Sequence, residues 1–111
     1  MPGWAGHGDA VAYTYILECA DGSYYVGSTI NLEIRVWQHN NDPDGPVYTK
    51  RRRPVRLVWA AEFDSIIEAL AYEKRVQGWN RRKREALIRG DFTALPGLSR
   101  RKAVQERDDG G

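Results

Sequence analysis

The chain has 111 residues, of which 41% are hydrophobic and 29% charged, and its formal net charge is +2 at pH 7. This length accommodates one globular domain and excludes two. No apolar run reaches the roughly 20 residues that span a bilayer, and the first ten residues show no secretory signal pattern, so we expect a cytoplasmic protein without a membrane partner. The single Cys19 excludes an internal disulfide and a cysteine-based zinc site.

Basic residues concentrate in the second part of the chain. Residues 1–49 hold six acidic residues and one basic residue, whereas residues 50–111 hold sixteen basic and nine acidic residues. Two basic clusters, residues 50–56 and 80–89, make this part the candidate surface for a polyanion, although such runs are equally often a solvated surface. Arg35 is the one basic residue of the acidic part, which makes it a candidate for a specific role.

The first part of the chain predicts a β-hairpin followed by a helix. Residues 12–19 and 24–28 are rich in aromatic and aliphatic strand formers, and the Asp21-Gly22 pair between them is a strong hairpin signal. Asn31 can cap a helix over residues 32–39, which the Asp-, Asn-, Pro- and Gly-rich segment that follows would end.

The second part predicts a third strand and two further helices. The sequence VRLVWAAEF at residues 55–63 reads as a strand, and Ser65 is a candidate cap for a helix over residues 66–79. A last helix is expected over residues 81–89, before Gly90. The expected organisation is one α+β domain over residues 11–97, between a mobile N-terminal segment (1–10) and a charged mobile tail (98–111).

Four tyrosines, at positions 13, 15, 24 and 25, flank the hairpin turn. Tyrosine is a common strand residue, so packing is one explanation and chemistry at one or two hydroxyls is the other. Because side chains alternate along a strand, Tyr13 shares the face of Tyr15, and Tyr24 points away from Tyr25. Tyr24 is therefore the expected packing residue.

Arg35 and His39 are four residues apart and share one face of the predicted helix. A guanidinium can hold two phosphate oxygens, and an imidazole can shuttle a proton near neutral pH. A histidine at a helix end also acts as a simple cap near the last carbonyls. If the pair faces the tyrosine hairpin, it suits phosphodiester chemistry.

Glu73 is out of place in the predicted helix 66–79. A carboxylate on an inward helix face costs free energy unless a cation or a donor meets it. Glu73 therefore either pairs with an arginine at the edge of the core or binds a hard cation such as Mg²⁺, which usually takes one or two carboxylates. At about 100° per residue, Glu73 falls inside the arc of Ile66, Ile67, Ala69, Leu70 and Val76.

The order and spacing of these motifs resemble the GIY-YIG nuclease superfamily, over residues 12–95. Residues 48–58 also resemble a run shared by its small single-domain, uncharacterised group. The resemblance implies a three-stranded antiparallel sheet flanked by helices, with a metal-dependent DNA-cleaving site on one face. The matching positions are Tyr13-Thr14-Tyr15, Tyr25-Val26-Gly27, Asn31-Leu32, Arg35, His39, Glu73, Trp79 and Asn80.

The resemblance implies a role for each of four residues. Tyr15 and Tyr25 line the site, one of them as general base toward the attacking water. Arg35 contacts the scissile phosphate. Glu73 is the sole protein ligand of a divalent metal, Mg²⁺ or Mn²⁺.

The remaining matches are less complete. His39 corresponds to a histidine of some restriction-enzyme relatives, and Asn80 or Lys83 would occupy one later position of the site. Tyr13 stands where the family has a glycine, which affects the local backbone path more than the chemistry.

The identity of the general base stays open at this stage. A free tyrosine has a pKa near 10, so a tyrosine base needs nearby cations, and Arg35, the metal and Lys83 are available. Alternatively, Tyr15 or Tyr25 only orients the water, while His39 or water on the metal takes the proton.

The first basic cluster, residues 50–56, is the expected DNA-binding element and is called the basic loop below. It would neutralise the backbone beside the site, with Tyr48 stacking on an unpaired base. The expected substrate is DNA, whether single-stranded, duplex or branched, cleaved with little sequence preference in repair or processing, and a partner protein is one possible source of specificity. The expected phosphate contacts are Lys50, Arg51, Arg52, Arg53 and Arg56.

Two non-enzymatic functions remain as alternatives: a DNA- or RNA-binding module that retains the fold, and an interaction protein that delivers a partner to DNA. Binding alone gives no reason to keep an inward carboxylate near a phosphate. The joint presence of Tyr15, Tyr25, Arg35 and Glu73 therefore favours the nuclease.

Overall fold

The computed structural model describes residues 11–90 and 103–104, and its elements form the α+β fold that the sequence predicts. The predicted mobile segments, residues 1–10 and 98–111, lie outside the described residues except for positions 103 and 104. Among the described residues, no helix is long and apolar enough to cross a membrane. The elements in chain order are β1 (Ala12–Glu18), β2 (Tyr24–Thr29), α1 (Leu32–Asn41), α2 (Val47–Lys50), β3 (Arg56–Phe63), α3 (Ile66–Gln77), α4 (Arg81–Arg89) and β4 (Ala103–Val104).

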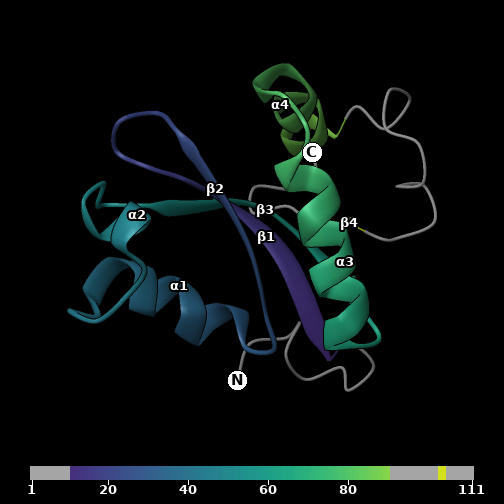
Figure 1. Ribbon diagram of the computed structural model, residues 1–111, viewed down its shortest axis with the longest axis horizontal. Helices are drawn as coiled ribbons and strands as arrows, with labels where there is room; N and C mark the ends of the chain where they lie inside the picture. The colour runs from purple at the N-terminus through teal and green to yellow at the C-terminus, as the bar shows by residue number, and fades with distance from the viewer. Residues whose placement is uncertain (1–10, 91–102, 105–111) are drawn as a thin grey trace.

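Strand β1 lies at the centre of an antiparallel sheet. The strand order is β2-β1-β3-β4, and Figure 1 shows β1 between its two long neighbours. The predicted three-stranded sheet is confirmed as β2-β1-β3, and the two-residue β4 adds to the outer edge of β3 opposite Ala60 and Ala61. β2 is therefore an edge strand, and its outer side is open to side chains from the helices.

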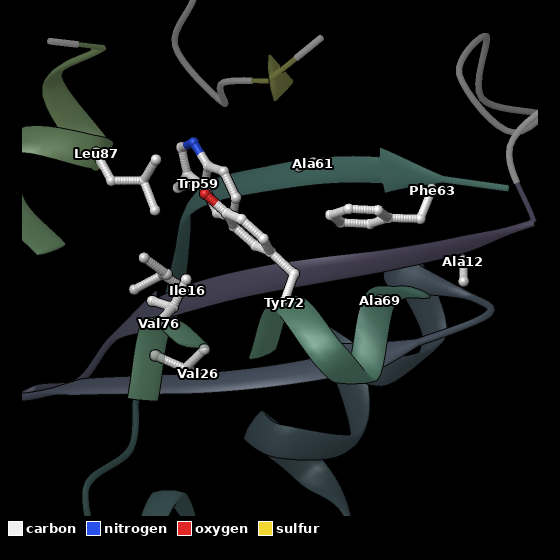
Figure 2. Close-up of a cluster of buried hydrophobic side chains, with 10 residues drawn as sticks. All are labelled: Ala12, Ile16, Val26, Trp59, Ala61, Phe63, Ala69, Tyr72, Val76 and Leu87. Carbon is white, nitrogen blue, oxygen red and sulfur yellow. The ribbon is translucent and has the colours of Figure 1, made fainter. Parts of the chain in front are cut away.

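The helices divide between the two faces of the sheet (Figure 1). α1, followed by α2, lies on the face where Tyr13, Tyr15 and Leu17 form a buried cluster with Leu32 of α1. α3 and α4 lie on the other face and build the second cluster with alternate residues of the same strands. Figure 2 shows this second cluster, which comprises Ala12, Ile16, Val26, Trp59, Ala61, Phe63, Ala69, Tyr72, Val76 and Leu87.

The two tyrosines of β2 point to opposite faces, as strand alternation predicts. Tyr24 packs toward α4, where the Arg81 guanidinium lies 4.5 Å from its ring centroid and Glu85 accepts its hydroxyl at 3.4 Å. Tyr25 packs against the cluster on the α1 face. Tyr24 is therefore the packing residue, and Tyr25 is available to a site beside α1.

The inward face of α3 differs from the predicted arc. Ala69, Tyr72 and Val76 are the buried residues of the helix, whereas Ile66, Ile67 and Leu70 are exposed. The small Ala69 allows close approach to the sheet, because its carbonyl accepts hydrogen bonds from the Thr14 hydroxyl at 2.7 Å and the Ser28 hydroxyl at 3.0 Å. The prediction that the whole apolar arc faces inward is wrong, and Glu73, which shares that arc, is half-buried beside the Ala69–Tyr72–Val76 stripe. The helix also ends at Gln77, two residues earlier than predicted.

The C-terminal turn of α1 is anchored by the segment that precedes β3. The Arg53 guanidinium donates hydrogen bonds to the carbonyl oxygens of His39 at 2.6 Å, Asp42 at 2.6 Å and Gln38 at 3.3 Å. The Gln38 carbonyl also accepts from the amide of Asp42 at 2.9 Å, whereas Arg53 is the donor that meets the His39 carbonyl in the last turn. A cation at this position satisfies terminal carbonyls and matches the negative end of the helix dipole. Asn31 caps the other end as predicted, its side-chain oxygen accepting from the amide of Ile34 at 3.1 Å.

The Arg53 contacts predict a large difference between two neighbouring arginines. Arg53→Ala should lower the free energy of unfolding by about 1.5–3 kcal/mol, the usual range for hydrogen bonds that involve a charged group. Arg51→Ala is the matched control, because the exposed Arg51 side chain has no partner among residues 11–90, and it should change stability by less than about 0.5 kcal/mol. Urea denaturation of both variants measures the effect, and equal stability would contradict the anchoring role.

Candidate active site

A hydrogen bond between two buried side chains joins the sheet to α1. The Tyr15 hydroxyl of β1 lies 2.9 Å from Nε2 of His39, which sits in the last turn of α1. Tyr15 is 1% exposed and His39 is fully buried. His39 therefore points into the sheet face and does not act as a cap on the last carbonyls of its helix.

The other ring nitrogen of His39 contacts α2. Nδ1 lies 2.7 Å from the hydroxyl oxygen of Thr49, which is also fully buried. The sequence analysis missed both α2 and Thr49, because a four-residue helix has too few residues to show a period. The one sequence signal for Thr49 is its place beside Tyr48, at the start of residues 48–58, the run that resembles the small single-domain group.

Tyr25 and Arg35 complete the α1 side of the site. The Tyr25 ring lies edge-on to the His39 ring, with 4.8 Å between centroids. Burial raises the pKa of both Tyr15 and Tyr25, and the charge and hydrogen bonding of Arg35 oppose that rise at both, so its guanidinium lies within electrostatic range of both hydroxyls. One of its amino groups is held by the Gln38 side-chain oxygen at 3.0 Å. An arginine poised beside two phenols can hold a phosphate there.

Burial keeps both Tyr15 and His39 neutral at neutral pH. Desolvation raises the pKa of Tyr15 to about 12, despite the opposing effect of Arg35. Desolvation and then the charges of Arg35 and Arg53 lower the pKa of His39 from 6.5 to about 4. The pair is therefore a phenol and a neutral imidazole, with no standing charge on either.

Glu73 lies at the open edge of β2. Gln77 donates to the Glu73 carboxylate at 2.8 Å and to the Val26 carbonyl of β2 at 3.3 Å, which holds the carboxylate beside the strand. The charge of Glu73 raises the pKa of Tyr15 and Tyr25, which places it within electrostatic range of both.

The predicted pairing of Glu73 with an arginine is not seen, because its carboxylate makes no ion pair within residues 11–90. The described residues also contain no group of three or more His, Cys, Asp or Glu side chains that could hold a metal ion. A half-exposed carboxylate without a cationic partner fits a hard cation such as Mg²⁺, which binds through one or two carboxylates and keeps several waters.

Gly27 makes room for the Tyr15 phenol. Gly27 pairs directly with Tyr15 in the β1–β2 register, and the Tyr15 phenol occupies the space that a Cβ at Gly27 would need. A Cβ at this position would lie 2.5 Å from the Tyr15 oxygen and 2.7 Å from the adjacent ring carbon. The glycine of the Tyr25-Val26-Gly27 motif is thus required by packing at the site.

Asn80 and Lys83 occupy the start of α4. The Asn80 side-chain oxygen accepts from the amide of Lys83 at 2.9 Å, so it caps that helix. The Lys83 ammonium lies 4.9 Å from the Trp79 ring centroid. The contacts of these two side chains therefore lie within the turn that begins α4, whereas the other five predicted site residues contact or act electrostatically on one another.

The basic loop has internal contacts at most of its positions. Arg52 binds Asp21 at 3.0 Å and the Tyr48 carbonyl at 2.9 Å, and its guanidinium lies 3.8 Å from the Tyr48 ring centroid. Lys50 donates to a loop carbonyl at 2.7 Å, and the exposed Arg56 pairs with a carboxylate of β1 at 2.7 Å.

Tyr48 lies next to the site. Its ring is 38% exposed and 6.0 Å from that of Tyr25. With Arg51 exposed in the same loop, these two residues are the ones best placed to meet a nucleic acid.

Comparison with known proteins identifies the family of the chain. The family model for the GIY-YIG catalytic domain matches residues 11–86. The chain belongs to the GIY-YIG family. The resemblance seen in the sequence motifs is therefore confirmed.

This GIY-YIG chain is similar to several UPF0213 proteins. One from Syntrophus aciditrophicus is 42% identical over 77 residues, which cover 69% of this chain and 88% of the relative. One from Staphylococcus saprophyticus is 45% identical over 76 residues, which cover 68% of this chain and 92% of the relative. The solution NMR structure of a UPF0213 protein from Bacillus halodurans has 39% identity and a TM-score of 0.46, and the match covers 79% of this chain and 88% of that one.

The contact between Gly27 and Tyr15 predicts that a single methyl group disturbs the site. Gly27→Ala should cost about 1–3 kcal/mol of stability through overpacking and displace the Tyr15 hydroxyl from His39. Gly78→Ala is the control, because a Cβ there meets its nearest atom at an ordinary 3.5 Å. Urea denaturation and the ring chemical shifts of His39 measure the two effects; unchanged shifts in Gly27→Ala would show that the glycine is not needed.

The low pKa of His39 predicts a pH-dependent stability. Below pH 6.5 the unfolded chain takes up a proton on this ring, whereas the folded protein does so only near pH 4, so stability falls as the pH drops through this window. The loss should reach at most about 3 kcal/mol. His39→Gln has no titrating group at this position, so its stability lacks this pH dependence. The stability difference between wild type and variant should therefore shrink as the pH falls from 7 to 4. A difference that stays constant, with His39 titrating near 6.5 by NMR, would contradict the buried neutral ring.

Proposed function

We propose that this GIY-YIG protein is a divalent-metal-dependent DNA endonuclease that hydrolyses phosphodiester bonds with little sequence specificity. The observation that carries the proposal is a hydrogen-bonded Tyr15–His39 pair with both Arg35 and Glu73 within electrostatic range of Tyr15. Phosphodiester hydrolysis needs an activated water, stabilisation of charge on the phosphoryl oxygens and help for the departing oxygen. The four side chains can supply these functions between them.

Arg35 would hold the scissile phosphate. Its guanidinium can donate to two nonbridging oxygens at once, and it lies beside the two phenols where the attacking water would sit. Since Gln38 holds one of its amino groups, the side chain is oriented before substrate arrives. Arg35 would stabilise the negative charge that grows on the phosphoryl oxygens during attack. An interaction that is stronger in the transition state than in the bound substrate raises the rate.

Tyr15 is the better candidate for accepting the proton of the water. With a pKa of about 12 it is not a tyrosinate, so it can take that proton only by passing its own to another group. His39 Nε2, at 2.9 Å, is such an acceptor. In this relay the water proton goes to the Tyr15 oxygen, the Tyr15 proton goes to Nε2, and the hydroxide attacks phosphorus.

Tyr25 contacts His39 through its ring, which suits it to orient the water or the phosphate. Formation of the imidazolium in a buried site is costly, and the negative charge of the bound phosphate would offset part of that cost.

Glu73 would hold the metal. Mg²⁺ or Mn²⁺ bound there supplies Lewis-acid polarisation of the phosphate and stabilisation of the departing 3′ oxygen. The open edge of β2 leaves room for the waters that such an ion keeps.

The basic loop and Tyr48 would guide the DNA. Arg51 is free to contact phosphates, and the half-exposed Tyr48 ring can stack on a base beside the site. The substrate would be single-stranded, duplex or branched DNA, with a cytoplasmic role in DNA repair or processing. Specificity would come from the structure of the DNA or from a partner protein.

Cleavage of labelled DNA tests the proposal. With Mg²⁺ or Mn²⁺, the wild type should cut at least one of the single-stranded, duplex and branched forms, and a chelator should abolish cutting. Glu73→Gln should be slower by at least about a hundredfold, the typical effect of removing one electrostatic stabiliser from an active site. Glu68→Gln, an exposed carboxylate on the same helix, is the control and should cut at the wild-type rate.

Two results would contradict this proposal. Equal cutting by wild type and Glu73→Gln would remove Glu73 from the reaction or reveal a contaminating nuclease. DNA binding by the wild type without any cutting would identify a non-catalytic DNA- or RNA-binding module that retains the fold.

A further inference from the structure

A chain of hydrogen bonds runs from the site into α2. It passes from Tyr15 to His39 Nε2 at 2.9 Å, from Nδ1 to the Thr49 hydroxyl at 2.7 Å, and from that hydroxyl to the Pro46 carbonyl at 3.3 Å. A neutral imidazole has one proton, which sits on either Nδ1 or Nε2, and the two forms have opposite consequences for Tyr15. Only the form with a bare Nε2 can accept the Tyr15 proton.

We propose that Thr49 is a positioning residue that holds His39 in the form with its proton on Nδ1, so that Nε2 stays free to accept the proton of Tyr15. This inference rests on the proposed function for its catalytic consequence. The assignment of the proton itself rests on the hydrogen bonds of Tyr15, His39, Thr49 and Pro46 and does not depend on DNA cleavage.

The inner end of this chain of hydrogen bonds, the Pro46 carbonyl, can only accept a hydrogen bond. A carbonyl oxygen has no proton, so the Thr49 hydroxyl must donate its single proton to Pro46 for that contact to be a hydrogen bond. The Thr49 oxygen then accepts from His39, which requires a proton on Nδ1. Thr49 is fully buried and takes no alternative partner from solvent.

The outer end of the chain can only donate. The Arg35 guanidinium carries five donors and no acceptor, so toward the Tyr15 hydroxyl it acts as a donor. The Tyr15 proton is then left for His39 Nε2.

The reverse direction leaves a buried proton without a partner. If Nε2 carried the proton and donated to Tyr15, the Tyr15 hydroxyl would need another acceptor. Within residues 11–90 the Tyr15 hydroxyl makes no hydrogen bond to an acceptor other than His39 Nε2: Arg35 cannot accept, and Tyr25 and Glu73 act on Tyr15 only through their charge. A buried donor without a partner costs about 1–3 kcal/mol, so both ends of the chain favour the same direction.

Two consecutive arginines hold the members of this chain in place. The backbone amide of Arg52 donates to the Thr49 carbonyl at 2.9 Å, and its guanidinium donates to the neighbouring Tyr48 carbonyl. Arg53 donates to the His39 carbonyl at 2.6 Å. The basic run therefore fixes α2 against α1, which gives Thr49 a defined position opposite Nδ1.

The test is the position of the ring proton, measured on the full chain by long-range ¹H–¹⁵N NMR at pH 7. His7→Gln leaves His39 as the one histidine of the chain and serves as the reference. We expect Nδ1 protonated and Nε2 bare in the reference. Thr49→Val, which removes the hydroxyl at nearly constant shape, should shift the ring toward the Nε2-protonated form or a mixture, and Thr49→Ser should restore the reference spectrum.

Kinetics of DNA cleavage then separate positioning from binding. Thr49→Val should lower the single-turnover rate by about a hundredfold or more, as expected when a catalytic histidine has the wrong tautomer, with DNA affinity within about twofold of the reference. Thr49→Ser should recover most of the rate. Urea denaturation confirms that each variant is folded at the assay temperature.

The possible failures are distinguishable. A protonated Nε2 in the reference, or a Thr49→Val variant with the reference spectrum and rate, would overturn the inference. If the spectra behave as expected but no form of the protein cuts any DNA, the proposed function fails and the assignment of the proton by Thr49 stands.

Discussion

The Tyr15–His39 hydrogen bond is the interaction on which the rest of the site depends. It joins the central strand of the sheet to the last turn of α1, and both side chains are buried. Because a buried polar group without a partner is costly, each residue requires the other in place. The surrounding structure meets this requirement: Gly27 admits the phenol, Thr49 meets the far side of the imidazole, and Arg53 secures the helix end.

The same burial explains how a phenol can take part in proton transfer at neutral pH. A tyrosine with a pKa of about 12 is a poor base on its own. Coupled to a neutral imidazole at 2.9 Å, it can pass a proton inward as it accepts one from water. Arg35 lies where negative charge would develop on the phenol and on the phosphate. In the proposed mechanism, these two neutral groups would move a proton and the Arg35 guanidinium would stabilise charge.

Much of the fold was predictable from the sequence because its signals are local. The Asp21-Gly22 turn, the cap residues Asn31 and Ser65, and strand alternation at Tyr24 and Tyr25 each depend on a few adjacent residues, and each is confirmed. α2 was not predictable, since one turn of helix has no period. The inward face of α3 is not the one that its hydrophobic pattern predicts. The close approach at Ala69 and the packing of the Tyr72 ring decide which side of the helix meets the sheet.

The site was predictable in its residues but not in its contacts. Motif order grouped Tyr15, Tyr25, Arg35, His39 and Glu73 as candidates. The structure places Tyr15, Tyr25 and Arg35 around the His39 imidazole, with Glu73 beside β2. The role of Thr49 depends on a contact between α1 and α2 that no spacing encodes. The basic run likewise read as a DNA-binding loop, whereas Arg53 is committed to the end of α1. The sequence alone does not show which basic side chains make contacts within the fold and which remain available to DNA.

In the proposed mechanism the two phenols of the site are unequal, with Tyr15 in the proton path and Tyr25 beside it. Single-turnover cleavage of the same labelled DNA by folded Tyr15→Phe and Tyr25→Phe tests this most directly. The Tyr15 variant should lose at least about a hundredfold in rate, the range for losing a general base, and the Tyr25 variant less than about tenfold. An equal loss in both, or a larger loss in Tyr25→Phe, would contradict the account.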